Sequence, residues 1–354
     1  MDFLAISGFI PISVLYFVFG VFAAIVAVQH NRRDETRECA TNDVSISAIF
    51  FMCAFLYPFM YERVGLDVEW QQTFFIISDF VMFSFLGVLL IFVGREVVLG
   101  RREPSRKIQR GYACALERTG NFDSGKKRDS NRKVLHLIPV GVILIWYVLS
   151  VVLAPELAAS GITVLGFAYF LIVLTGYGFV AMFMLAETLR LIDNHQRYYY
   201  TPDWAQKWFG SSLRKNECDT FISSIPLVLC FVPFLFGPFW IFMAVALITS
   251  LSDAAASVFG RRFGKHKLRL NKKKSWEGLV AGALSTLAFV FICYPIFRDP
   301  ADGLLRWWQL ALVAIGTTLV FVVIDVFSRR IVDNILNPLL CGGFMILAVM
   351  LLMP

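Results

Sequence analysis

Acidic side chains stand at the ends of apolar runs, or inside them, in the second half of the sequence. Asp253 ends one such run in the stretch TSLSDAAAS, and Asp325 lies within another in VVID. An ionisable residue next to lipid is costly and is a candidate for function by default. Carboxylate and amide oxygens also suit Mg²⁺, which proteins share with nucleotide phosphates. We expect catalytic roles for Asp253, Asp325 and Asp333, and a metal site made of Asp253, Asp325, Asp333 and Asn334. Capping of the last helix is the structural alternative for Asp333 and Asn334.

A basic loop with two glycines follows the first of these acids. Gly260 and Gly264 let the backbone approach phosphate oxygens, which the cations of the loop can neutralise. Ser275 then has the type and place of a helix N-cap, with Glu277 in the first turn, and a helix N-terminus attracts anions. An ordinary positively charged membrane loop is the alternative. The expected phosphate-binding residues of this stretch are Ser257, Arg261, Arg262, Lys265, Lys273, Lys274, Ser275 and Glu277.

A shorter motif of the same kind stands at the start of an earlier apolar run. It consists of Arg132, Lys133 and His136, and we expect these residues to contribute to the nucleotide site. The alternative is a basic flank of a membrane helix, with the histidine reaching towards the surface.

The composition indicates that membrane helices position these side chains. The chain is 58% hydrophobic with a mean hydropathy of +0.67, and apolar runs of about 20 residues recur, the length that crosses a bilayer. The runs are continuous rather than alternating, so they are helices and not barrel strands. The sequence therefore predicts an all-α polytopic membrane protein with about ten transmembrane helices. They are expected at about 9–29, 44–61, 73–94, 134–153, 161–186, 220–236, 239–259, 277–296, 308–327 and 335–353. A turn at Gly237–Pro238 separates the two helices within 220–259.

The positive charge is distributed unevenly along the chain. Of the 33 Lys and Arg residues only Arg63, Arg298 and Arg306 fall outside five segments, which are 30–43, 95–133, 187–219, 260–276 and 328–334. Basic loops stay in the cytosol, so the N-terminus is expected outside and the active site on the cytosolic face. The net charge of +7 has this origin, and no nucleic acid partner is expected.

The seven cysteines include no C-x-x-C pair, and the four histidines show no ligand spacing, so neither a disulfide framework nor a zinc site is indicated.

The composition changes near residue 130. We expect residues 1–130 to form an N-terminal unit of three spans plus a basic cytosolic loop, and residues 131–354 to form a catalytic core of seven spans.

These motifs, in this order, resemble those of the CTP-dependent lipid kinases, a family that includes dolichol kinase, phytol kinase and the yeast-type diacylglycerol kinase. The family has R-K-x-x-H, then D-A-x-A-S-x-x-G-R-x-x-G-K, then K-S-x-E-G, and late in the chain an acid followed by D-N-x-x-x-P. The similar stretches here begin at Arg132, Asp253 and Lys274, and the late ones are Asp325 and the segment from Asp333 to Pro338. The resemblance covers about residues 131–354.

The same stretch resembles phosphatidate cytidylyltransferase almost as closely as it resembles the lipid kinases. The segment from Lys273 to Gly278 resembles its K-K-T-W-E-G motif. The signature of that enzyme ends in H-G-G-x-x-D-R-x-D, whereas this chain has the segment from Leu340 to Phe344 and no D-R-x-D. The ending therefore favours the kinase.

The resemblance implies an enzyme that transfers the γ-phosphoryl of CTP to a lipid alcohol such as a polyprenol or diacylglycerol, with Mg²⁺ as cofactor. The cations of the loop would contact phosphates, and the acids would hold the metal or accept the hydroxyl proton. One alternative is a cytidylyltransferase that makes a CDP-lipid from CTP and phosphatidate. A second alternative is a membrane transporter without enzymatic activity. Each hypothesis places the protein in the bilayer, and a homodimer is compatible with all of them.

Overall fold

The computed structural model describes residues 7–33, 36–119, 126–193, 195–213, 217–268, 271, 274–299, 303–328 and 333–352, without the side chains of residues 37, 38 and 126–135. Of the described residues 83% are helical, and none of them forms a strand. The all-α prediction is therefore confirmed.

Within the described residues, eight helical segments are long and apolar enough to cross a membrane. They are Ser7–Asn31, Cys39–Phe59, Val68–Arg102, Val164–Leu191, Phe239–Phe263, Trp276–Phe297, Trp307–Phe327 and Asp333–Leu352. Two shorter apolar helices, His136–Val152 and Ser224–Phe236, lie where the other two spans were expected. The chain is thus a polytopic membrane protein, while the external N-terminus stays a prediction.

Contacts between residues divide the chain into two units. Unit 1 comprises Met1–Leu135 and Val142–Ile225, and unit 2 comprises His136–Gly141 and Pro226–Pro354. The expected catalytic core over residues 131–354 concerns function and stays a prediction.

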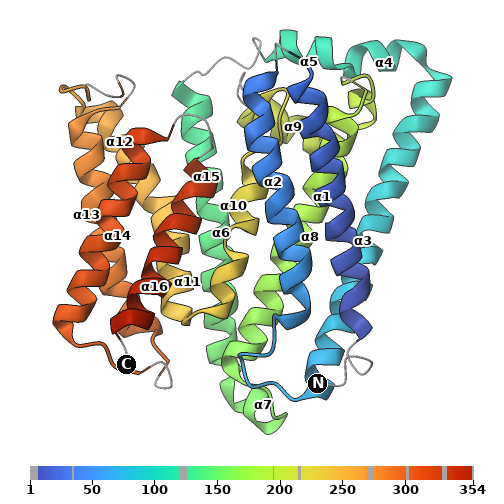
Figure 1. Ribbon diagram of the computed structural model, residues 1–354. Helices are drawn as coiled ribbons and strands as arrows, with labels where there is room; N and C mark the ends of the chain where they lie inside the picture. Colours follow the sequence, from blue (N-terminus) through green and yellow to red (C-terminus); the bar gives the residue numbers. More distant parts are fainter. Residues whose placement is uncertain are drawn as a thin grey trace. The chain divides into compact units, whose positions relative to one another are not determined.

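Unit 1 is built from long apolar helices joined by short ones. Its main elements are α1 (Ile10–Asn31), α2 (Arg37–Leu56), α3 (Val68–Arg102), α4 (Pro104–Arg110), α5 (Tyr112–Arg118), most of α6 (Lys126–Val152), α7 (Ala154–Ala159), α8 (Val164–Leu191) and α9 (Asp203–Ser212) (Figure 1). Helices α1 and α2 pack against each other, and the buried Tyr16 hydroxyl of α1 donates to the Tyr177 carbonyl of α8 at 2.6 Å. Part of the expected basic loop is helical, in α4. Arg106 of α4 donates through Nε and Nη2 to the Glu96 carboxylate of α3, which ties the two helices together.

A buried ion pair orders the last segment of unit 1. Arg190 and Glu187 of α8 are both fully buried and lie 2.5 Å apart. The Arg190 guanidinium also donates to the carbonyls of Cys218 and Thr220. A buried charge is tolerated when it is paired and hydrogen-bonded, so this arginine fixes the chain that follows α9.

Unit 2 carries the acids and the basic loop. Its elements after the short helix α10 (Ser224–Leu229) are η5 (Val232–Phe236), α11 (Phe239–Leu247), η6 (Ile248–Ser252), α12 (Asp253–Phe263), α13 (Trp276–Phe297), α14 (Trp307–Phe327), α15 (Asp333–Leu336), η8 (Asn337–Cys341) and α16 (Gly342–Leu352). Elements α11, η6 and α12 form one continuous helix that starts after Gly237–Pro238, as the sequence predicts. The end of α14 and the start of α15 lie at the same end of unit 2 as α12 (Figure 1, top).

Small residues let α12 and α13 pack closely. A Cβ atom on Gly278 would lie 2.5 Å from the Ala256 carbonyl oxygen and 2.9 Å from the Gly260 Cα. A Cβ on Gly282 would lie 2.9 Å from the Ala256 Cβ. Both helices therefore place small residues four apart at their contact, the pattern that allows membrane helices to approach. The close approach holds the end of α12 against the start of α13, where the candidate site begins.

Candidate active site

The structure brings the three predicted acids together in unit 2. Asp253 is the first residue of α12, Asp325 lies in the last turns of α14, and Asp333 begins α15. Asp253 and Asp325 are each only 7% exposed. The charges of Asp253 and Asp333 both act on the Asp325 carboxylate. Three carboxylates from three helices thus share one electrostatic environment next to the basic loop.

Two π-helical segments flank these acids, and no sequence motif predicted them. Segment η6 ends directly before Asp253, and η8 begins three residues after Asn334; the two segments pack against each other. Widened turns of this kind are frequent at functional sites. The buried hydroxyls of Ser250 and Ser252 and the Asn337 side-chain oxygen have no hydrogen bond within the described structure. Their only signal in the sequence is that they are polar residues in apolar runs, in TSLSD and DNILNP.

The expected basic loop is a short hairpin. Lys267 and Ser275 form an antiparallel bridge, and the Leu268 N–H donates to the Lys274 carbonyl at 3.0 Å. The Trp276 N–H donates to the His266 carbonyl at 2.9 Å. Leu268 is buried and anchors the hairpin through its side chain. The backbone at Lys267 and Lys274 is therefore held by the protein's own hydrogen bonds.

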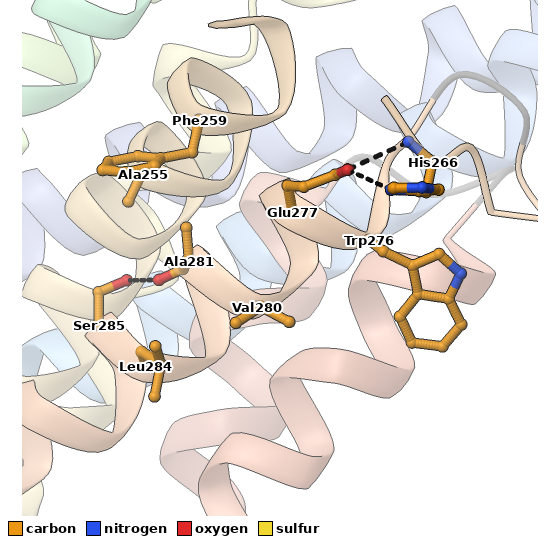
Figure 2. A pocket seen from close by; sticks show the side chains of 9 residues that line it. All are labelled: Ala255, Phe259, His266, Trp276, Glu277, Val280, Ala281, Leu284 and Ser285. Atoms are coloured by element: carbon orange, nitrogen blue, oxygen red, sulfur yellow. Dashed lines mark hydrogen bonds and ion pairs between the residues drawn. The ribbon is translucent and has the colours of Figure 1, made fainter. Parts of the chain in front are cut away.

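Ser275 and Glu277 fasten this hairpin to α13. The Ser275 hydroxyl accepts a hydrogen bond from the Gly278 N–H at 3.3 Å, which confirms the predicted N-cap. The Glu277 carboxylate accepts from the Lys265 N–H at 3.1 Å. It also accepts from the His266 N–H at 3.1 Å and from His266 Nδ1 at 2.7 Å (Figure 2). Both side chains thus bond to protein groups, and their roles as phosphate contacts stay predictions.

Lys274 connects the hairpin to the acids. Its ammonium pairs with the Asp325 carboxylate, which lies on α14. The Lys274 side chain is 29% exposed and that of Asp325 is 8% exposed. A flexible cation that solvent can reach is therefore held by a fixed, buried carboxylate.

The other predicted cations of this stretch face outward. Arg261, Arg262 and Lys265 are exposed, and Arg261 Nε donates to the Ser257 carbonyl at 3.3 Å. Exposed cations at the mouth of a site can receive a charged ligand without first breaking buried contacts. Lys273 lies outside the described residues.

The earlier basic motif is only partly visible. The side chains of Arg132 and Lys133 lie outside the described part of the structure, and both residues belong to unit 1. His136 is 1% exposed and belongs to unit 2, the unit that carries the acids.

A groove of about 690 Å³ lies along the contact of α12 and α13. Ala255 and Phe259 of α12 line it together with Val280 and Leu284 of α13 (Figure 2). Its polar lining residues bond within the protein: Ser285 donates to the Ala281 carbonyl of its own helix, and Glu277 accepts from the His266 ring. The groove is therefore mostly apolar, with Glu277 and His266 at its polar end.

The acids fit a magnesium ion that arrives together with phosphates. Their donors are hard carboxylate and amide oxygens, the ligands that this ion prefers. Among the described residues no three acids, histidines or cysteines form a ready-made metal cage. Such a cage is not required, since Mg²⁺ usually takes one or two protein carboxylates and completes its shell with phosphates and water. Asp253, Asp325, Asp333 and Asn334 are the residues that would hold it.

Comparisons with known proteins agree on one type of chemistry. The sequence model of the cytidylyltransferase family matches residues 3–328. Phosphatidate cytidylyltransferase 3 from Arabidopsis thaliana is 42% identical over 57 residues, which make up 16% of this chain and 12% of that protein. No solved structure matches the chain. The comparisons thus favour the alternative hypothesis over the lipid kinase, which they do not confirm.

Proposed function

Because the chain belongs to the cytidylyltransferase family, we propose that it transfers the cytidylyl group of CTP to the phosphate of a membrane lipid of the phosphatidate type. The products would be a CDP-lipid and pyrophosphate. The observation that carries this proposal is the ion pair between buried Asp325 of α14 and Lys274 of the basic hairpin. Asp253 and Asp333 influence the same carboxylate electrostatically. Such an arrangement suits a polyphosphate bound with a divalent cation.

The reaction would be a displacement at the α-phosphorus of CTP. A lipid phosphate oxygen forms the new bond to that phosphorus, and the bond from the α-phosphorus to the oxygen bridging to the β-phosphate breaks. The electron pair leaves with pyrophosphate. Little covalent chemistry is left to the protein in phosphoryl transfers, so positioning and charge neutralisation supply the catalysis. The cations Arg261, Arg262, Lys265, Lys273 and Lys274 would take these roles.

The nucleophile determines what the acids have to do. A phosphate monoester has its second pKa at about 6, so it is already anionic at neutral pH and needs no general base. A lipid hydroxyl, the acceptor in a kinase, would need one. In the proposed reaction the acids therefore serve the divalent cation, which supplies charge neutralisation at the phosphates when bound.

The kinase hypothesis depended on the chain after residue 325, whereas the family match covers residues 3–328. CTP labelled at its α- or its γ-phosphate distinguishes the three hypotheses. Cytidylyl transfer carries the α-phosphate of CTP into the lipid, and kinase activity carries the γ-phosphate. A transporter would consume no CTP. We further propose that the reaction takes place at the cytosolic surface of the membrane, where the basic segments are expected.

A further inference from the structure

We propose that Lys274 and a divalent cation compete for Asp325, and that CTP binding moves the Lys274 ammonium from Asp325 to a phosphate oxygen. The inference depends on the proposed use of CTP, and it concerns how the site is loaded. It follows from the contact between a mobile cation and a fixed acid.

Asp325 is the fixed partner of this contact. It lies in α14 and is 7% exposed, so its carboxylate has little freedom to turn away. The Lys274 ammonium occupies one of its oxygens. Mg²⁺ requires nearly ideal octahedral geometry and a strongly negative site. A bound ammonium removes a ligand direction and adds positive charge, so it opposes metal binding at this acid.

Lys274 is the mobile partner. Its backbone is held in the hairpin by the hydrogen bonds that join Leu268 to Lys274 and Lys274 to Asn271. Its side chain has a flexible four-carbon stem, and it is partly exposed to solvent. The ammonium can therefore change partners while the hairpin keeps its shape.

Charge gives this exchange a direction. Asp253 and Asp333 influence Asp325 electrostatically, as Lys274 does, so the acids form one group that a divalent cation can bind. A divalent cation that binds these acids repels the ammonium. The triphosphate that enters with the metal then offers the ammonium its nearest new partner. Metal and nucleotide should consequently bind with positive coupling, and each should bind weakly alone.

The test measures binding and not turnover. Mn²⁺ binding to the purified protein in detergent is followed by electron paramagnetic resonance, with and without α,β-methylene CTP, which cannot undergo the transfer. The variant Lys274→Met removes the charge but keeps an unbranched side chain only one atom shorter. Lys267→Met is the matched control, because Lys267 is on the same hairpin and its side chain is exposed. Lys274→Gln serves if Lys274→Met does not fold.

We expect Lys274→Met to bind Mn²⁺ alone about tenfold more tightly than the parent protein, and to lose most of the tightening that the CTP analogue causes. Lys267→Met should behave like the parent. Adding Asp325→Asn to Lys274→Met should abolish the gain. Equal Mn²⁺ affinity and equal coupling in Lys274→Met and the parent would overturn the inference. Failure of the parent to bind the analogue at all would instead refute the proposed function, and the affinity for Mn²⁺ alone would still decide the exchange.

Discussion

Glu277 and His266 close the basic hairpin onto the first turn of α13. The carboxylate accepts from the His266 ring at 2.7 Å and from the His266 N–H at 3.1 Å, and it also receives the Lys265 N–H. One acidic side chain thus holds two consecutive residues of the segment that carries the cations. This relationship makes Glu277 a positioning residue in our account.

Replacing Glu277 should loosen the hairpin. In Glu277→Gln the side chain can no longer accept all three hydrogen bonds. The hairpin then no longer holds Lys265 and Lys274 in place to contact the phosphates of CTP. We expect kcat/KM for CTP to fall about tenfold, with KM for the lipid little changed. Steady-state kinetics with each substrate varied in turn measures this. Ser285→Ala on the same helix is the control, and equal losses for both variants would remove the positioning role.

Asp253 should be needed for turnover but not for folding. It is buried at the start of α12, and Asp253→Asn keeps its shape while removing a charge from the proposed metal site. We expect turnover to fall at least about a hundredfold, because transition-state charge is then poorly stabilised. Thermal unfolding in detergent should change little. Full turnover in a folded Asp253→Asn protein would exclude Asp253 from the site. Asp67→Asn, an exposed acid at the start of α3, is the matched control.

The crossing of α12 and α13 gives a test of packing. In Gly278→Ala the new methyl group would lie 2.5 Å from the Ala256 carbonyl oxygen, so the helices must move apart. We expect the free energy of unfolding to fall by about 1–3 kcal/mol and activity to fall with it. Gly343→Ala is the control, because a Cβ there meets nothing within 4 Å. Equal stability of the two variants, from unfolding curves in detergent, would contradict the close approach.

The buried pair of Arg190 and Glu187 predicts a large loss of stability in unit 1. Arg190→Met leaves the Glu187 carboxylate and several carbonyls without their donor. Breaking a buried pair in this way costs about 3–5 kcal/mol. The control is Arg197→Met, whose partner Asp193 is half exposed, and for which the expected loss is below about 1 kcal/mol. Unfolding of the two variants at the same midpoint would show that the buried network is not needed.

The sequence predicts much of this architecture for identifiable reasons. Apolar runs of membrane length predict the helices, and the acids are visible because they interrupt those runs. The Ser275 cap follows from a short polar residue ahead of an apolar run. The hairpin was not predictable, because a run of cations has no periodicity that would indicate its pairing. The π-helical segments were not predictable either, because a widened turn depends on the tertiary packing around Ser250 and Asn337.

The reaction was the property that the sequence motifs specified least. Both CTP-dependent families share the hairpin motif, so the decision depended on the absence of D-R-x-D near the end of the chain. The family match over residues 3–328 rests on a far larger part of the sequence. A short motif that is missing is weaker than a long similarity that is present.

The position of the label in the product tests the central claim most directly. The purified protein is incubated with Mg²⁺, phosphatidate and CTP labelled at either the α- or the γ-phosphate, and in parallel with diacylglycerol or a polyprenol. We expect label from α-labelled CTP in the organic phase with phosphatidate, and label from γ-labelled CTP in released pyrophosphate. Label from γ-labelled CTP in a lipid phosphate made from the alcohols would contradict cytidylyl transfer and establish the kinase instead.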